Sequence, residues 1–389
     1  MTAAAYLVLL ERWIAAWVQD RRGPNRVGVP LTKIRLFGLG QPLADGLKFI
    51  FKEEYTPAHV NRGLFVLAPI AILTSALAVF AVIPFGSVIP GEPIRGWLGD
   101  ASDQPIELIA APGVNVALLY VFALSSIGVY GVILGGWASN NKYSFLGMLR
   151  SSAQLIAYEL PLGLGILGVV AAVGSLELDA IIRHQAETGW WFALAQPLGF
   201  IVFMIAAFAE AARLPFDLPE AEQELIGGYH TEYAGMKLLL FLVAEFLHMV
   251  TAAFLIVILF LGGWHFWGLT GSDETTITWG TAILRIVVLL VKIFGVIVFF
   301  MMVRWSWPRF RFDQLMNLAW KVMLPLGMVN LTAVAVFEEL RRSLDSPMWL
   351  LVVLSWGVCL AGWLAVAWAA PLASDNRPRR EWSPSNVDA

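Results

Sequence analysis

Apolar residues occur along this chain in long uninterrupted runs, and polar residues gather between them. Most runs approach the length of about 20 residues that a helix needs to cross the hydrocarbon core of a bilayer. No run alternates apolar and polar residues with a period of two, which favours helices whose backbones satisfy their own hydrogen bonds. We therefore predict an all-α polytopic membrane protein of eight to nine transmembrane helices, over residues 64–85, 114–137, 152–173, 197–212, 237–262, 279–303, 318–337 and 347–370, with a shorter ninth candidate at 3–18.

The composition supports this class and excludes several others. Of 389 residues, 58% are hydrophobic and only 14% are charged, and the mean hydropathy is +0.71, so a soluble globule would leave too much apolar surface exposed. We find no basic patch with interleaved aromatic residues and predict no nucleic-acid partner. The single cysteine, Cys359, excludes disulfides, iron–sulfur ligation and thiolate zinc sites within the chain. Any redox centre is therefore expected on partner subunits.

The polar segments predict the orientation and the peripheral parts. When the spans alternate across the membrane, most Lys and Arg residues between them fall on one side, which the positive-inside rule makes cytoplasmic. Residues 41–54 place Leu43, Leu47 and Ile50 on one helical face, which predicts an amphipathic helix at the interface. Residues 1–370 are expected to form one transmembrane domain, and the proline-broken residues 371–389 are expected to form a disordered tail. Glu11 and Arg12 interrupt the first run, which argues against a cleavable signal peptide.

Acidic residues cluster in and beside the predicted cytoplasmic loop 213–235. Arg213 is the single formal positive charge among six carboxylates: Glu210, Asp217, Glu220, Glu222, Glu224 and Glu232. Carboxylates held this close have coupled protonation equilibria, which suits proton handling. The alternative is a solvated loop that is merely acidic, because charge runs are usually solvated faces.

Four ionisable residues lie inside predicted spans, namely Glu159, Glu245, Arg285 and Lys292. Burying charge in a membrane is costly, so each is a functional candidate, and together they could form a protonatable chain across the bundle. The alternative is that Glu159 and Glu245 are structural ion-pair partners of Arg285 and Lys292 and join the helices.

Two short motifs are assigned no chemistry. Gly163, Gly165 and Gly168 match the dinucleotide-binding pattern G-x-G-x-x-G, but they lie inside a span, which favours close helix packing instead. Glu245 and His248 form a Glu-x-x-His pair of which the chain has no second copy, so we predict no metal site.

Four strings together resemble a known family, the membrane subunit that joins the two arms of respiratory complex I, which is the subunit 1 family of NADH-quinone oxidoreductase. They are ERWIAAWVQDRRGPNRVG from Glu11, QPLADGLKFIFKEE from Gln41, GWASNNKYSFLGMLRSSAQLIAYE from Gly136 and AEAARLPFDLPEAEQELIGGYHTEYAGMK from Ala209. The resemblance covers residues 9–337 in order.

The resemblance implies a subunit without a redox cofactor that forms a quinone cavity together with a peripheral-arm subunit. Its substrate would be a quinone, with ubiquinone and menaquinone both open, and flavin and iron–sulfur clusters would lie on partners. Other complex I subunits, of the quinone module and the small membrane subunits, are the implied protein partners, and the location is the bacterial inner membrane. The implied quinone-binding residues are Gln19, Arg21, Asp45 and Lys48. The implied carboxylates of a proton relay are Glu159, Glu210, Asp217, Glu220, Glu222, Glu224, Glu232 and Glu245.

Some features depart from the family pattern. Only ten residues precede Glu11, so a first span shorter than that of relatives is expected, and a Trp-rich span at 347–370 is added. Two other functions stay open. One is the equivalent subunit of a membrane-bound hydrogenase complex, and the other is a stand-alone transporter that uses Glu159, Glu245 and Lys292 as its ion path. The second lacks the inverted repeats that transporters usually contain.

Overall fold

The computed structural model describes residues 1–28, 37–90, 106–217, 226–271, 278–344 and 347–373, and these residues are mostly helical. The described α-helices are α1 (Thr2–Val18), α2 (Gln41–Phe51), α3 (Arg62–Ala78), α5 (Ala117–Ala138), α6 (Lys142–Val173), α7 (Leu178–Thr188), α8 (Phe192–Ala195), α9 (Pro197–Glu210), α11 (Gly235–Phe260), α12 (Trp267–Thr270), α13 (Trp279–Ser306), α14 (Phe312–Asn317), α15 (Leu324–Leu344) and α16 (Met348–Ala373). Short 3₁₀ segments occur at η1 (Val79–Ala81) and η2 (Gly228–His230), and a π-helical segment, η3 (Leu318–Met323), joins α14 to α15. The two-residue strands β1 (Val88–Ile89) and β2 (Ile106–Glu107) pair antiparallel.

The predicted class, an all-α polytopic membrane protein, is confirmed. Within the described residues, seven helices are long and apolar enough to cross a bilayer, over Arg62–Ala81, Ala117–Ala138, Lys142–Val173, Gly235–Phe260, Trp279–Ser306, Phe312–Leu344 and Met348–Trp368. The predicted spans 197–212 and 3–18 correspond to shorter helices, α9 with 14 residues and α1 with 17. The amphipathic helix is present as α2, and its apolar face is exposed. The predicted tail beyond Ala373 lies outside the described residues.

One predicted boundary was wrong. The span predicted at 152–173 is the later part of α6, which begins at Lys142 and has 32 residues. Its start is fixed by Asn141, whose side chain accepts a hydrogen bond from the backbone N–H of Tyr143 at 2.9 Å. Small and polar residues of the first turns, among them Ser144, Gly147 and Ser151, are buried against neighbouring elements. These residues read as a loop in sequence because they carry little hydrophobic signal.

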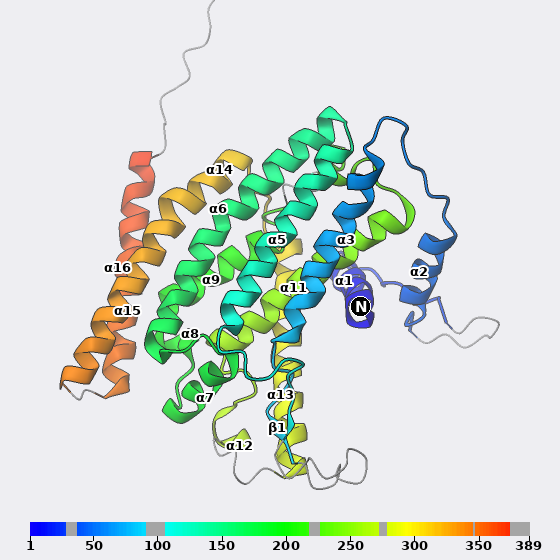
Figure 1. The fold of residues 1–389 in the computed structure, drawn as a ribbon. Helices are drawn as coiled ribbons and strands as arrows, with labels where there is room; N and C mark the ends of the chain where they lie inside the picture. The colour runs from blue at the N-terminus through cyan, green and yellow to red at the C-terminus, as the bar shows by residue number, and fades with distance from the viewer. Residues whose placement is uncertain (29–36, 91–105, 218–225, 272–277, 345–346, 374–389) are drawn as a thin grey trace, which may run out of the picture.

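Helix α11 is the centre of the bundle. It is apolar on all sides, as expected for a helix surrounded by others, and it packs against α1, α3, α9 and α13. Every residue from Met249 to Phe260 is buried. Figure 1 shows α1 and α2 at one end of the bundle and α15 and α16 at the other end. The two ends of the chain therefore serve different faces of α11.

The glycines of the G-x-G-x-x-G match pack helices, as predicted, at two of their three positions. A Cβ added at Gly165 would lie 3.1 Å from Phe203 of α9, and one at Gly168 would lie 2.7 Å from the amide nitrogen of Asn330 of α15. Nothing lies within 4 Å of the position for Gly163. The close approach of α6 to α9 and α15 thus depends on the later two glycines.

The two cations of α13 are bound mainly by the turn that follows α11. Lys292 donates to the backbone carbonyls of Leu261, Gly263 and His265 at 2.6, 3.0 and 2.6 Å, which occupies all three of its N–H donors. Arg285 donates to the carbonyl of Thr270 at 3.1 Å. Within the described residues Lys292 forms no ion pair, so the predicted alternative in which it joins helices by pairing with Glu159 or Glu245 was wrong.

His265, in the same turn, lies close to this concentration of positive charge. Burial of the imidazole is the main cause that lowers the pKa of His265, and the charge of Lys292 lowers it further. The turn therefore favours a neutral histidine beside two buried cations.

A backbone contact joins α6 to η2. A Cβ on Gly147 would lie 2.6–2.7 Å from the backbone of Gly228 and Tyr229, where neither side can rotate away. We expect Gly147→Ala to lower the free energy of unfolding by about 1–3 kcal/mol, because overpacking forces the backbones apart. Thermal unfolding in detergent measures this effect. Gly163→Ala, on the same helix but facing open space, is the matched control and should show no comparable loss.

Candidate functional site

A large cavity of about 950 Å³ opens between α1, α2, α11 and α13. Its wall is mostly apolar, with Ala4 and Val8 of α1, Phe49 of α2 and Val243 and Phe246 of α11 among the lining residues. Four arginines and three carboxylates also line it: Arg12, Arg21, Arg213, Arg304, Glu11, Asp45 and Glu245. This combination of apolar wall and a few charged groups, at this volume, is typical of a binding site for an organic ligand.

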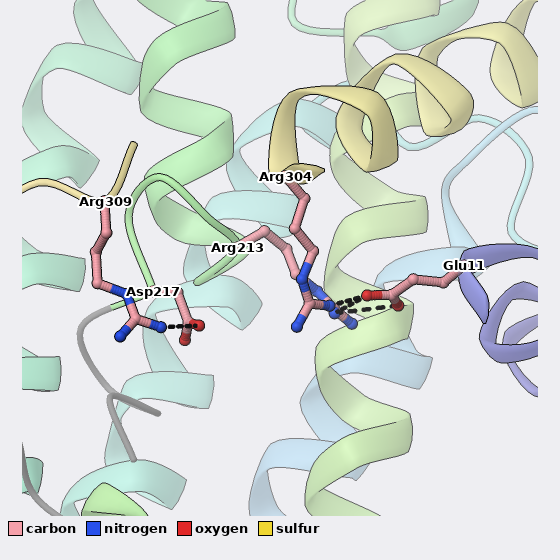
Figure 2. A network of polar contacts seen from close by, with 5 residues as sticks. All are labelled: Glu11, Arg213, Asp217, Arg304 and Arg309. Atoms are coloured by element: carbon pink, nitrogen blue, oxygen red, sulfur yellow. Dashed lines mark hydrogen bonds and ion pairs between the residues drawn. The ribbon is translucent and has the colours of Figure 1, made fainter. Parts of the chain in front are cut away.

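A buried ionic network closes the inner side of the large cavity (Figure 2). Glu11 of α1 receives Arg304 of α13 through one carboxylate oxygen, and Arg213, from the segment after α9, lies 3.5 and 3.4 Å from its two oxygens. Glu11 and Arg213 are only 9% and 7% exposed, so water does little to screen them. The Arg213 guanidinium also lies 4.2 Å from the ring centroid of Phe246. One carboxylate therefore holds three separate parts of the chain together, with an excess of positive charge.

A second pair lies beside this network. Arg309, which follows α13, donates to Asp217 at 3.2 Å, and Asp217 is 5% exposed (Figure 2). Asp217 lines neither cavity described here. The structure places this member of the predicted relay in an ion pair that ties the start of the acidic loop to the α13–α14 connection.

The residues implied for quinone binding are divided between the large cavity and its surroundings. Arg21 and Asp45 line the cavity, and Asp45 accepts from Arg12 at 2.8 Å and from Gln41 at 2.9 Å. Gln19 is absent from the lining but accepts from Arg21 at 2.8 Å, so it orients a lining residue. Lys48 lies on the exposed side of α2.

A small cavity of about 50 Å³ lies deeper, between α3, α5, α6, α9 and α11. This volume accommodates a few water molecules. Three carboxylates predicted for the relay line it: Glu159 of α6, Glu210 at the end of α9 and Glu245 of α11. Ser126 donates to Glu159, Ser125 hydrogen-bonds to Glu210, and the imidazole of His248 completes the polar wall. The structure thus brings together acids that are 86 residues apart at the extremes of the sequence.

Glu245 is the residue that the two cavities share. It lines the small cavity with Glu159 and Glu210, and it lines the large cavity with Arg213 and Glu11. Its carboxylate is 8% exposed and therefore stands in the partition between them. Chemically, a carboxylate at this place can take up a proton on one side and release it on the other.

The other predicted acids lie elsewhere. Glu232 accepts a hydrogen bond from Asn141 at 2.6 Å, beside the start of α6, and lines neither cavity. Glu220, Glu222 and Glu224 lie outside the described residues. Their predicted participation in a relay stays a prediction.

Sequence reasoning missed the network around Glu11. Its members were visible as charges within or at the end of apolar runs, with Glu11 inside the first run and Arg304 at the end of α13. Charges in such places usually have a partner or a function. Their pairing was not foreseeable, because Glu11 and Arg304 are 293 positions apart.

The sequence of this chain matches a known family over most of its length. The profile of the family described as NADH dehydrogenase matches residues 1–335. The chain belongs to the NADH dehydrogenase family. The family predicted from the four strings is thereby confirmed.

Curated relatives within this family are similar over nearly their whole length. The first of two examples of the H-type membrane component of NADH-quinone oxidoreductase, from Cytophaga hutchinsonii, is 45% identical over 333 residues, which cover 85% of this chain and 91% of the relative. The second, from Geobacter metallireducens, is 46% identical, covering 88% and 93%. NADH-quinone oxidoreductase subunit 8 of Thermus thermophilus is 46% identical, covering 88% and 85%. Helix α16 begins beyond the residues that match the NADH dehydrogenase profile.

Proposed function

We propose that this chain is the membrane subunit of an NADH-quinone oxidoreductase in which the large cavity holds a quinone and the carboxylates of the small cavity carry protons. The single observation that carries the proposal is the position of Glu245 in the walls of both cavities. The names of the relatives support the overall reaction. The electrons would come from flavin and iron–sulfur clusters on partner subunits, and this chain would be a subunit rather than an enzyme by itself.

The large cavity has the properties that a quinone site needs. Its apolar wall suits an isoprenoid tail, and its opening beside the exposed apolar face of α2 suits entry from the lipid. Reduction of a quinone by two electrons places negative charge on its oxygens until two protons arrive. Arg213 and Arg304, which share one carboxylate, supply fixed positive charge that stabilises that anion.

The small cavity has the properties that a proton relay needs. Protonation of one of its carboxylates favours ionisation of the next, because like charges repel in a poorly screened space. A change of charge in the large cavity acts first on Glu245 and then on Glu159 and Glu210. We further propose that the complex lies in the bacterial inner membrane with the acidic loop on the cytoplasmic side, as the Lys and Arg distribution indicates.

Filling the large cavity tests where the quinone binds. Gly46 of α2 lines the cavity, and a Cβ there would meet nothing within 4 Å, so Gly46→Trp adds volume without a clash. We expect the KM of the assembled complex for a short-chain quinone to rise by about tenfold or more, equivalent to about 1.4 kcal/mol of binding. Reduction of an artificial acceptor by NADH should stay unchanged.

Gly357→Trp is the matched control for the cavity-filling variant. Gly357 also lies in a helix with nothing within 4 Å of its Cβ position, but it is in α16 at the other end of the bundle. Equal quinone kinetics in both variants and in the unmodified complex would contradict a quinone site in the large cavity.

A further inference from the structure

The carboxylate that stands between the two cavities is held from one side by a tyrosine. The hydroxyl of Tyr229 donates to Oε1 of Glu245 at 2.9 Å, and the tyrosine is 2% exposed. Tyr229 lines the small cavity but not the large one. The hydrogen bond therefore draws the Glu245 carboxylate toward Glu159 and Glu210.

The tyrosine itself is fixed in place by its surroundings. It belongs to η2, whose backbone contacts Gly147 of α6 so closely that no side chain fits between them. Its ring packs edge-on against Phe241 of α11, with centroids 5.3 Å apart. A hydroxyl on a backbone this constrained is a fixed reference point, so the mobile partner of the hydrogen bond is the glutamate.

The large-cavity side offers a competing attraction. Arg213 lines that cavity together with Glu245, and its guanidinium packs on Phe246, the residue after Glu245. Arg213 also belongs to the network with Glu11 and Arg304, which carries excess positive charge. Glu245 thus lies between a neutral donor on one side and fixed cations on the other.

We propose that Tyr229 is a positioning residue whose hydroxyl holds the Glu245 carboxylate on the small-cavity side and so determines which cavity the carboxylate faces. The inference rests on the proposed function and adds to it the group that sets the direction of proton exchange. A hydrogen bond to a charged group changes an equilibrium by on the order of tenfold or more. Without the hydroxyl, Glu245 divides its time between the two cavities.

The test is Tyr229→Phe in the assembled complex in its membrane. This change removes the hydroxyl and keeps the ring that packs on Phe241. We expect kcat for NADH-driven reduction of a short-chain quinone to fall by about tenfold, with KM for the quinone unchanged, because Tyr229 does not line the large cavity. The number of protons pumped per electron should fall as well. Reduction of an artificial acceptor should be unaffected and reports how much complex has assembled.

Tyr233→Phe is the matched control. Tyr233 is 4% exposed and stacks on Phe65 with ring centroids 4.0 Å apart, in the same aromatic cluster as Phe241. Its hydroxyl has no hydrogen-bond partner among the described residues, so its removal should leave quinone kinetics unchanged. A redox-induced infrared difference spectrum adds a direct readout. The carboxyl band that disappears in Glu245→Gln should shift in Tyr229→Phe and stay in place in Tyr233→Phe.

The outcomes separate this inference from the proposed function. If Glu245→Gln is impaired while Tyr229→Phe behaves like Tyr233→Phe, the role of Tyr229 is refuted and the proposed function stands. If Glu245→Gln itself keeps full coupled activity, the proposed relay fails. A rise in KM for Tyr229→Phe at unchanged kcat would also overturn the inference, because it would make Tyr229 part of quinone binding.

Discussion

Glu11→Gln is expected to lower the free energy of unfolding by about 3–5 kcal/mol and to abolish stable assembly of the complex at growth temperature. Glu11 is the only carboxylate that the described network offers to both Arg213 and Arg304. Removing its charge leaves two guanidinium groups in a poorly solvated place without compensation. Thermal unfolding in detergent, followed with a thiol- or tryptophan-based fluorescence signal, measures the loss.

Glu54→Gln is the control for this variant. Glu54 pairs with Lys237 at 3.6 Å, but its side chain is 45% exposed, so water compensates for the lost partner. We expect a change below about 1 kcal/mol there. A Glu11→Gln protein as stable as the Glu54→Gln protein would show that the network around Glu11 contributes little to stability.

Glu245→Gln is expected to reduce coupled quinone reduction by about 10²-fold or more, the contribution of a positioned proton-transfer group. Glutamine keeps the shape of the side chain and an oxygen that can accept from Tyr229, but it cannot exchange a proton with either cavity. Electron flow from NADH to an artificial acceptor should persist, because that path does not involve this chain in the proposed mechanism. Proton pumping in reconstituted vesicles, measured beside both electron-transfer rates, checks the prediction.

Glu338→Gln separates this effect from the general effect of losing a buried acid. Glu338 is 7% exposed and pairs with Arg341 at 3.1 Å, on α15 and away from both cavities. Loss of stability alone is expected. An equal loss of coupling in both variants would mean that Glu245 has no special place in proton transfer.

The helices of this fold were predictable to the extent that they are apolar. Long hydrophobic runs located α3, α5, α11, α13 and α16, because a membrane span must cover its backbone with apolar side chains. The first three turns of α6 were not recognised, because Ser144 and Ser151 face other parts of the protein and need no hydrophobic character. Burial against protein and burial against lipid leave different signals, and only the second is visible in hydropathy.

The candidate site was predictable as a list of residues but not as an arrangement. The charge cluster identified Glu210, and the cost of charge in a span identified Glu159 and Glu245, which the structure places around one cavity. The same reasoning put Glu232 with them, although it lies beside Asn141. Lys292 was expected to pair with an acid and instead binds three backbone carbonyls. Such partners depend on which helix ends meet, and that is decided by packing across the whole bundle.

The bonds from Lys292 to the end of α11 also have a mechanical consequence. Glu245 lies fifteen residues before Phe260, the last residue of α11, which at 1.5 Å per residue makes an arm of about 22 Å from the anchored end. A tilt of α11 by about 3° around that anchor moves Glu245 sideways by about 1 Å. Such a displacement is enough to break its hydrogen bond to Tyr229. The helix therefore works as a pivoted lever, with its fulcrum at Lys292 and its working point in the wall between the two cavities.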